Sequence, residues 1–212
     1  MRRIILFLLF FITMLCYSQT IHNYDYVIDM HYYKSFYSKT IKGPSFVIYK
    51  LYKGGGDSKR ASFNFKGYRD LPYFDYAKSG YDRGHLVPAE DLADTKVRLR
   101  STFYYVNCVP QTPNLNRGIW KRYETHIRKL SQSDSLLIIC GGCDYPRSGS
   151  ANSRLIPRNC FKVVYDIKTK ACLYALLFSN EGTTSSVTYS EDLLKAFTFR
   201  KAMNLYMKKQ NY

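Results

Sequence analysis

Two short clusters of polar residues in this sequence have the types and spacing to do chemistry. The first is Tyr81-Asp82-Arg83-Gly84-His85. A neutral imidazole titrates near pH ~6.5 and can take a proton from water at physiological pH, and Arg83 could hold a phosphate oxygen through two parallel hydrogen bonds. Gly84 would let the backbone approach another segment or a ligand closely. Taken alone, a histidine beside an arginine is more often structural than catalytic, so both interpretations stay open.

The second cluster runs from Asn107 to Arg128, and its second half has helical spacing. Asn116, Trp120, Glu124 and Arg128 are four residues apart, so they lie along one slowly drifting helical face. Asn116 and Glu124 are about 12 Å apart along the axis, too far for both to bind one ion directly. Because helical side chains lean toward the N-terminus, Glu124 reaches back toward Asn116. Asn116 could therefore bind a cation directly while Glu124 holds a water on that cation.

The donors in that arrangement suit magnesium. Mg²⁺ keeps several waters, prefers oxygen ligands and needs few protein ligands where a phosphate supplies others. The alternative is an amphipathic core helix that packs Trp120 inward and pairs Glu124 with Arg128 on the surface. Judged on this segment alone, the structural alternative is favoured, and Trp120 is predicted to be buried in either case.

The elements that must position these clusters follow from the hydrophobic pattern. Alternating and continuous apolar runs predict strands, of which the run ending at Gly141-Gly142 is expected to be central and buried. The expected strands cover 45–52, 85–88, 102–109, 136–140, 161–165 and 172–178, the last two as a hairpin. Helical spacing predicts a helix over 116–130, and Ser190 is expected to cap a C-terminal helix. The pattern indicates an α+β fold with a central antiparallel sheet flanked by helices.

The N-terminus has the pattern of a secretory signal peptide. Arg2 and Arg3 precede a 12-residue apolar run, Ile4 to Leu15, which is too short to cross a bilayer as a helix. Cleavage is expected before Gln19, which leaves residues 1–18 as signal peptide and 19–212 as a single domain with no stable membrane span. An uncleaved anchor and lipidation of Cys16 are the alternatives. The mature protein is predicted to be secreted or periplasmic.

The chain is strongly basic. Its net charge is +16, and loss of Arg2 and Arg3 would lower it to +14. Such a domain is suited to an anionic partner, such as a nucleic acid, a cell surface or an acidic polysaccharide, although a basic surface can also serve solubility. A non-cutting DNA-binding module explains the charge equally well. A disulfide-stapled envelope protein is a third possibility.

Without Cys16, five cysteines remain: Cys108, Cys140, Cys143, Cys160 and Cys172. Export favours disulfides, but an odd number leaves at least one thiol unpaired within the chain. Cys140-Gly-Gly-Cys143 lacks a second pair with zinc-site spacing and an evident thioredoxin-like context. The cysteines are therefore interpreted as structural or partly free.

Together the two clusters resemble the DNA/RNA non-specific endonuclease family of ββα-metal (His-Me finger) nucleases. The resemblance rests on Gly80-Tyr-Asp-Arg-Gly-His85-Leu-Val-Pro-Ala, followed by Asn107, Gln111, Leu115-Asn116-Arg117-Gly118, Trp120 and Glu124. Several polar residues recur at fixed offsets that packing alone does not demand. The resemblance extends more loosely from about Tyr32 to the C-terminal helix, and it implies a ββα-metal active-site motif.

The resemblance implies a role for each matched residue. His85 matches the general base, Asn116 the metal-ligating asparagine and Glu124 the acid that contacts metal-bound water. Asn107 matches the asparagine that helps to position the histidine.

Four arginines are implied to act near the phosphate. Arg83 and Arg128 match arginines of the phosphate and active-site network. For a further arginine upstream of the histidine, Arg60 is the candidate, with Lys59 and Lys53 as alternatives. We expect Arg60, Arg83 and Arg117 to contact substrate.

We therefore expect a Mg²⁺-dependent endonuclease, with Mn²⁺ as a possible substitute, that cuts DNA and RNA through contacts to the phosphate backbone and leaves 5′-phosphate ends. Because no 2′-hydroxyl takes part, both polymers are expected substrates. The sequence shows no base-reading helix and no organised aromatic stacking platform, so little sequence preference is expected. The oligomeric state is left open.

Overall fold

Seven strands form one antiparallel sheet in the computed structural model, which describes residues 21–60, 63–184 and 186–212. Their order across the sheet is β1-β2-β3-β6-β7-β8-β9, and β4 and β5 form a separate two-stranded ribbon. The large sheet consists of β1 (Tyr26–Asp29), β2 (Tyr33–Ser38), β3 (Gly43–Leu51), β6 (Leu136–Cys143), β7 (Asn159–Asp166), β8 (Cys172–Ser179) and β9 (Val187–Tyr189). The ribbon consists of β4 (Asp82–His85) and β5 (Cys108–Gln111). The predicted signal peptide lies outside the described residues.

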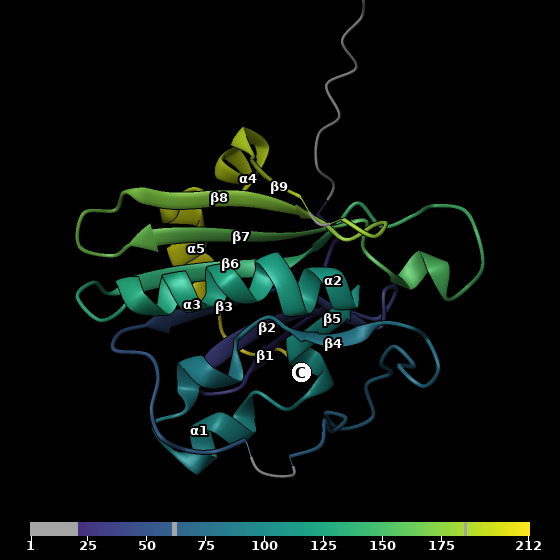
Figure 1. The fold of residues 1–212 in the computed structure, drawn as a ribbon, viewed down its shortest axis with the longest axis horizontal. Helices are drawn as coiled ribbons and strands as arrows, with labels where there is room; N and C mark the ends of the chain where they lie inside the picture. The colour runs from purple at the N-terminus through teal and green to yellow at the C-terminus, as the bar shows by residue number, and fades with distance from the viewer. Residues whose placement is uncertain (1–20, 61–62, 185) are drawn as a thin grey trace, which may run out of the picture.

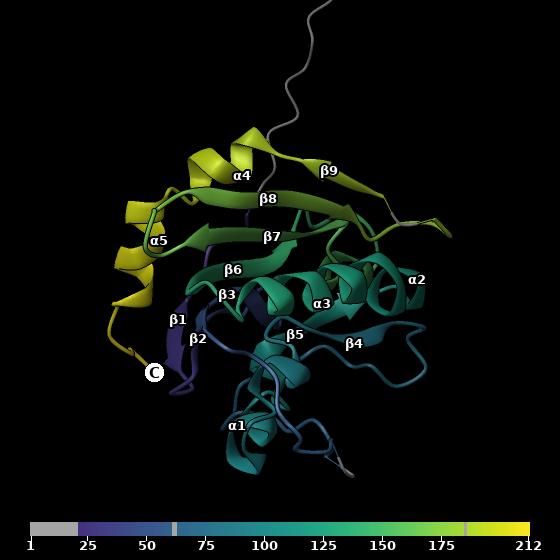
Figure 2. The ribbon, with the colours of Figure 1, turned by 60° about the vertical axis from the view of Figure 1, so that its left-hand side comes forward.

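Helices cover both faces of the sheet, which confirms the predicted α+β class. Figures 1 and 2 show α3 and the two-stranded β4–β5 ribbon on one face of the sheet, and α4 and α5 on the other. The helices are α1 (Lys96–Ser101), α2 (Pro113–Leu115), α3 (Lys121–Leu130), α4 (Glu191–Ala196) and α5 (Phe199–Tyr206). Shorter turns are η1 (Ala89–Leu92), η2 (Tyr105–Asn107), η3 (Asn116–Trp120) and η4 (Ser153–Leu155).

A hydrophobic core lies on each face of the sheet. Strand β6 contributes to both cores because its alternate side chains point to opposite faces. Ile138 packs with Trp120 and Ile127 on the α3 side. Its neighbour Ile139 packs with Phe197 on the α4–α5 side. A strand buried on both faces reads as a continuous apolar run, which explains the pattern at 136–140 and confirms its central place.

Several predicted elements are confirmed with small changes in extent. The predicted strand at 45–52 is β3, and the predicted hairpin is β7–β8. Ser190 caps α4 by accepting a hydrogen bond from the Leu193 amide at 3.2 Å, although the C-terminal region forms two helices. Strand β6 continues through Gly141, where a side chain would collide with the backbone of Ser45 on β3. The glycine therefore permits close strand packing and does not end the strand.

Two predicted strand boundaries are wrong. Strand β4 ends at His85 instead of beginning there, and β5 begins only at Cys108. The Asn107 side chain accounts for both changes. Its Oδ1 accepts from the Val87 amide at 2.9 Å, and its Nδ2 donates to the carbonyls of Val87 at 3.0 Å and Thr102 at 2.9 Å. A side chain thus replaces the ladder that a continuous strand would have formed.

The predicted helix at 116–130 is present but not continuous. At Gly118, inside the turn η3, the backbone leaves helical geometry (φ −99°, ψ −111°), so the residues before it are kinked relative to the regular helix α3. Kinks commonly occur at glycine. None of the helices within the described ranges is long and apolar enough to cross a membrane.

Candidate active site

The ribbon and the α2–α3 segment bring the two sequence clusters together. His85, the last residue of β4, lies opposite Cys108 of β5. The indole of Trp120, which is fully buried, donates from Nε1 to the His85 carbonyl at 3.2 Å. Thr112 caps α2 through its side chain, and Pro113 occupies the first turn, where its missing N–H costs no hydrogen bond. The segment bearing Asn116 thus begins directly after β5.

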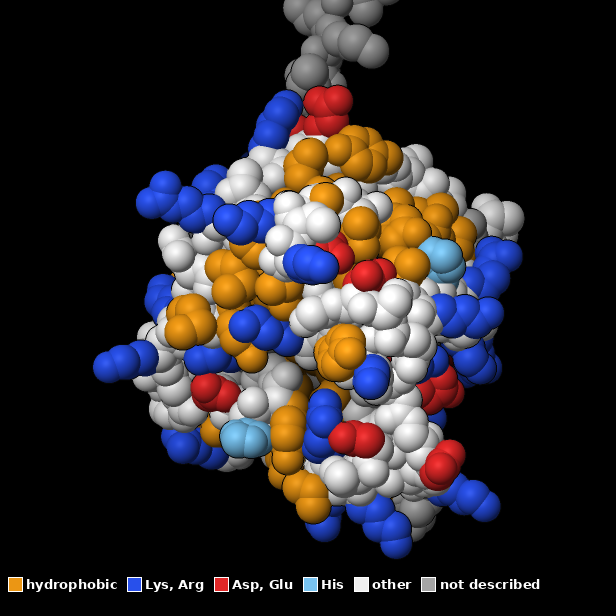
Figure 3. All heavy atoms as spheres, turned by 90° about the vertical axis from the view of Figure 1, so that its left-hand side faces the viewer, with side chains coloured by type: hydrophobic (Ala, Val, Ile, Leu, Met, Phe, Trp, Pro, Cys, Tyr) orange, Lys and Arg blue, Asp and Glu red, His pale blue; other side chains and the backbone are white. Residues whose placement is uncertain are grey.

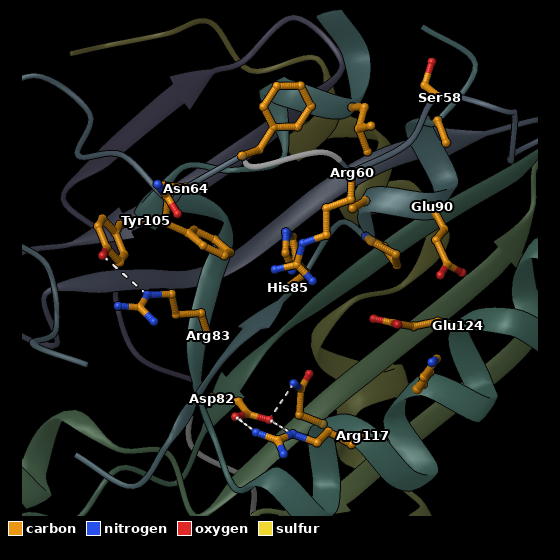
Figure 4. Close-up of a pocket in the computed structure, with 18 of the residues that line it drawn as sticks. Ser58, Arg60, Asn64, Asp82, Arg83, His85, Glu90, Tyr105, Arg117 and Glu124 are labelled. Carbon is orange, nitrogen blue, oxygen red and sulfur yellow. Dashed lines mark hydrogen bonds and ion pairs between the residues drawn. The ribbon is translucent and has the colours of Figure 1, made fainter. Parts of the chain in front are cut away.

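A cleft of about 880 Å³ lies between these elements. Figure 4 shows His85 and Arg60 at its centre, Glu124 directed toward them from α3, and Asp82 with Arg117 on another wall. Seven of the eight predicted site residues line it: Arg60, Arg83, His85, Asn116, Arg117, Glu124 and Arg128. The structure therefore brings both clusters to one cavity.

His85 is half-buried among aromatic rings. Its ring centroid is 4.8 Å from that of Phe65 and 5.0 Å from that of Phe103. Burial, with Arg60 adding a smaller effect, lowers the pKa of His85 to about 3, so the imidazole is neutral at physiological pH. The Nε2 atom is buried and has no hydrogen-bond partner among the described residues. The ring is thus in the protonation state that a base requires.

Asn116 is oriented by Asp82. The Asn116 Nδ2 donates to Asp82 Oδ2 at 3.0 Å, and Arg117 donates to both oxygens of the same carboxylate, from Nε at 2.8 Å and from Nη2 at 2.7 Å. Burial would raise the pKa of Asp82, but the hydrogen bonds from Arg117 and Asn116 outweigh it and lower the pKa. Since Nδ2 faces the carboxylate, the Asn116 Oδ1 is turned away from Asp82.

Glu124 makes no hydrogen bond or ion pair within the described part of the chain. The alternative interpretation of this segment predicted a surface pair between Glu124 and Arg128, and that pair does not form. Arg128 donates from Nε to Asp91 at 2.8 Å and pairs through Nη1 with Glu90 at 3.0 Å. Burial raises the pKa of Glu124 to about 7; Lys162 and Arg128 oppose this rise, and Asp91 adds to it. An isolated, partly protonated carboxylate therefore faces the cleft.

The remaining arginines differ in how far they are engaged. Arg117 is bound to Asp82, although its side chain is 71% exposed. Arg83 is exposed and donates from Nε to the Tyr105 hydroxyl at 3.4 Å. The guanidinium of Arg60 lies 5.2 Å from the centroid of the Phe103 ring. Arg60 and Arg83 thus keep most of their donors available to a ligand.

Asn107 does not line the cleft. It is fully buried, and it holds the chain just after His85 through the hydrogen bonds to Val87. Its contact with the histidine is therefore indirect, through the backbone.

Sequence analysis missed the partners of these residues. Asp82 was part of the quoted motif but received no role of its own. Asp91, which is 2% exposed and accepts from the Tyr49 hydroxyl at 3.0 Å, was not considered. Lys162 was also missed; it is 1% exposed, and its Nζ lies 3.7 Å from the centroid of the Trp120 ring. An acidic residue in a turn and a lysine within an apolar strand carry no sequence signal of such roles.

The donors at the cleft fit a lightly ligated Mg²⁺. In the described ranges, no three His, Cys, Asp or Glu side chains group closely enough to hold a metal ion. One amide oxygen and one carboxylate on a wide cleft are instead the kind of set that leaves room for water and phosphate. The five cysteines from Cys108 onward are free thiols, four of them buried.

Comparison with known proteins identifies the family. The model of the DNA/RNA non-specific endonuclease family matches residues 13–204. Human mitochondrial endonuclease G is 31% identical over 114 residues, which are 50% of this chain and 38% of that protein. A nuclease of Nostoc sp. is 37% identical over 93 residues, which are 42% of this chain and 33% of that protein. The chain thus spans less than half the length of these relatives.

The fold has a solved counterpart. A crystal structure of the EndoG/EndoGI complex superposes with a TM-score of 0.66 at 21% identity, covering 82% of this chain and 86% of the other. That likeness concerns the fold, whereas the family match covers most of the sequence. This chain belongs to the DNA/RNA non-specific endonuclease family.

Proposed function

We propose that this protein is a Mg²⁺-dependent endonuclease that hydrolyses DNA and RNA with little sequence preference and leaves 5′-phosphate ends. The observation that carries the proposal is that His85, Asn116 and Glu124 line one cleft. Metal-assisted phosphodiester hydrolysis needs a base and oxygen ligands for a metal. The cleft offers a neutral imidazole as the base, and an amide oxygen and a carboxylate as the oxygen ligands; this carboxylate receives no hydrogen bond from the described residues. Family membership supports the same reaction class.

His85 acts as the general base. The imidazole is neutral at physiological pH, so it can take a proton from water as that water attacks phosphorus. Burial and Arg60 weaken it as a base, and the negative charge of a bound phosphate would offset that effect. The bond from phosphorus to the 3′ oxygen then breaks, and the phosphate stays on the 5′ side. The hydrogen bond from Trp120 holds the His85 carbonyl, and the side chain of Asn107 holds the backbone two residues later, at Val87. Such fixation keeps the base in the orientation for proton transfer.

Asn116 would hold the metal through Oδ1, with Glu124 beyond it in the surrounding water. Bound Mg²⁺, or Mn²⁺ in its place, would supply positive charge at the phosphate and at the departing oxygen. Asp82 keeps the Asn116 amide turned, and Arg128 is held by Asp91 and Glu90. These residues orient the site instead of reacting.

Arg60 and Arg83 bind the phosphate backbone. Guanidinium groups can hold phosphate oxygens with two hydrogen bonds each, and the net charge of +16 adds a long-range attraction. Lys and Arg side chains are scattered over the face shown in Figure 3. Contacts of this kind are independent of base identity and should weaken steeply with salt.

Incubation of the protein with supercoiled plasmid and with RNA, with and without Mg²⁺, tests the proposal. Cleavage of both polymers is expected with Mg²⁺ and none in EDTA, and end-labelling should show 5′-phosphates. His85→Ala should abolish cleavage while circular dichroism and DNA binding stay nearly unchanged. A wild-type protein that binds plasmid but leaves it intact with Mg²⁺ would instead be a DNA-binding module.

We also propose that the protein is exported to the periplasm or the medium. The support is the basic and apolar pattern of residues 2–15, which lie outside the described part of the structure. N-terminal sequencing of the mature protein should begin at Gln19.

A further inference from the structure

A row of aromatic side chains leads away from His85: Phe65 and Tyr105 line the cleft, and Tyr73 continues the row beyond the cleft lining. Phe65 contacts His85, with 4.8 Å between centroids, and the Phe65 centroid is 5.7 Å from that of Tyr105. Tyr73 stacks on Tyr105 with 3.9 Å between centroids and 7° between ring planes. We call Phe65, Tyr105 and Tyr73 the aromatic row. Figure 4 shows Tyr105 beside Arg83 at the edge of the cleft.

Backbone contacts fix the row in place. The Lys66 amide donates to the Phe103 carbonyl at 3.0 Å, and the Tyr105 amide donates to the Lys66 carbonyl at 2.9 Å. These bonds hold Phe65 and Tyr105 next to each other although they are far apart in sequence. The residue before Tyr73 is anchored as well, because the Pro72 carbonyl accepts from the Tyr37 hydroxyl.

The outer member of the row is open to solvent. Tyr73 is 46% exposed, whereas the nearby Phe74 and Tyr76 are buried at 4% and 7%. Tyr76 also stacks on Tyr105, with 5.8 Å between centroids and 16° between planes. Within the described part of the chain, Tyr105 is the aromatic ring that packs on Tyr73. Buried neighbours thus provide the packing in this region, and a large flat ring is left presented to water.

We propose that Tyr73 is a stacking platform for an unpaired nucleobase, one that belongs to a strand whose phosphate lies at His85. This inference rests on the proposed function for the position of the strand. Every base has a π-face, so an aromatic ring stacks on it with little regard to base identity. In a duplex both faces of an internal base are covered by neighbours, whereas a single strand can offer one. The platform therefore favours single-stranded segments.

The charges beside the row suit the same ligand. Arg83 donates to the Tyr105 hydroxyl and lies 5.1 Å from the Tyr76 centroid, so a free guanidinium edge accompanies the rings. A positive groove that follows the backbone, with aromatic rings for the bases, is the usual construction of a single-strand site. Because Tyr73 is separated from His85 by two other rings, it would hold a neighbouring base and not the nucleotide at the scissile bond.

Fluorescence anisotropy of a labelled oligothymidylate and of a duplex, both in EDTA to prevent cleavage, tests this platform. Stacking contributes ~1–3 kcal/mol per base, so Tyr73→Ala should weaken single-strand binding about 5- to 150-fold. Duplex binding should change by less than about twofold. Tyr73→Phe should bind like wild type, and Tyr73→Leu, which keeps an apolar cover on Tyr105, should bind like Tyr73→Ala. Tyr189→Ala is the matched control, because Tyr189 is 60% exposed on β9.

An abasic strand of the same length supplies the decisive comparison. Wild type should bind it as weakly as Tyr73→Leu binds the oligothymidylate, and Tyr73→Leu should weaken its binding no further. Equal losses on single strand and duplex, or unchanged single-strand binding in both Tyr73→Ala and Tyr73→Leu, would overturn the platform. Because these measurements need no turnover, they separate the platform from the nuclease proposal, which fails if wild type with Mg²⁺ leaves plasmid intact.

Discussion

Replacing Asp82 with asparagine removes the charge that orients Asn116 while keeping the size and shape of the side chain. In the structure the Asp82 carboxylate accepts one bond from Asn116 and two from Arg117. An amide at position 82 has a single acceptor oxygen, so it cannot accept all three. Its own N–H₂ would also point at Arg117 or at Asn116. We expect the Asn116 amide to lose its fixed orientation.

The loss of Mg²⁺ affinity can be estimated separately for the bond from Asn116 and for the pair with Arg117. A hydrogen bond to a charged group contributes about 1.5–3 kcal/mol, which corresponds to roughly 10- to 150-fold in affinity. The pair with Arg117 is worth about 0–1 kcal/mol, because the Arg117 side chain is 71% exposed. Asp82→Asn should therefore weaken Mg²⁺ binding by about 10- to 100-fold, the usual range for a residue that supports a metal ligand. Arg117→Met should weaken it by less than about fivefold.

Titration of cleavage against Mg²⁺ concentration, together with calorimetric Mg²⁺ binding, measures both effects. The Asp82→Asn variant should need more Mg²⁺ for half-maximal rate and recover most of its rate at saturation. Its melting temperature should stay close to that of wild type. If Asp82→Asn requires the same Mg²⁺ concentration as wild type, Asp82 does not support the metal ligand. If Arg117→Met has the larger effect, Arg117 rather than Asp82 orients Asn116.

Three further predictions concern the cleft and its support. The pKa of Glu124 is about 7 without metal, so below pH 7 Mg²⁺ binding must displace a proton from this carboxyl group. The Mg²⁺ affinity measured by calorimetry should therefore rise from pH 6 to pH 7 and level off above pH 7. Glu124→Gln should remove this pH dependence. Lys162 lowers the pKa of Glu124, so Lys162→Met should move the same rise to higher pH. A Cβ at Gly84 would collide with the buried Gln111 side chain, so Gly84→Ala should lower the free energy of unfolding by about 1–3 kcal/mol in urea, and an unchanged value would contradict that collision.

Acid should destabilise the folded protein through His85. The folded pKa of about 3 lies below the ordinary value of 6.5, so between these values the unfolded chain binds a proton that the folded chain does not. The contribution of the neutral ring to stability is present above about pH 6.5 and is lost as the pH falls toward 3. Urea unfolding at pH 7 and at pH 4.5 should show a smaller difference for His85→Gln than for wild type. An equal difference would mean that another group causes the acid sensitivity.

The sequence could predict those features that depend on local patterns. The apolar run at 136–140 indicates a buried central strand, because alternate residues point to opposite faces and all of them must be apolar when both faces are covered. Ser190 before two acidic residues predicts a helix start because its side chain can accept from a free amide. Likewise, the offsets around His85 and Asn116 indicate one site, and the structure places both residues on the same cleft.

The sequence could not predict features that depend on contacts between distant segments. The fixed offset of four residues suggested a pair between Glu124 and Arg128, but Asp91 and Glu90 from η1 hold Arg128. The aromatic row was missed for the same reason, because Phe65, Tyr73 and Tyr105 come from separate segments and show no spacing pattern. Asn107 shifted two strand boundaries because an asparagine side chain can bond backbone in several ways, which local propensity does not distinguish.

The cleft contains cations of two kinds, and the distinction bears on how it treats a polyanion. Arg128 is tied to Asp91 and Glu90, and Arg117 to Asp82, so their charges are largely balanced before any ligand arrives. Arg60 has no ion pair with a described residue, and Arg83 has a single bond to a neutral hydroxyl. A phosphate therefore gains most from Arg60 and Arg83, which lie on the His85 side. The ion pairs of Arg117 and Arg128 instead hold Asp82, Glu90 and Asp91 in place, so under the proposed function they support the wall on which the proposed cation would meet the same phosphate.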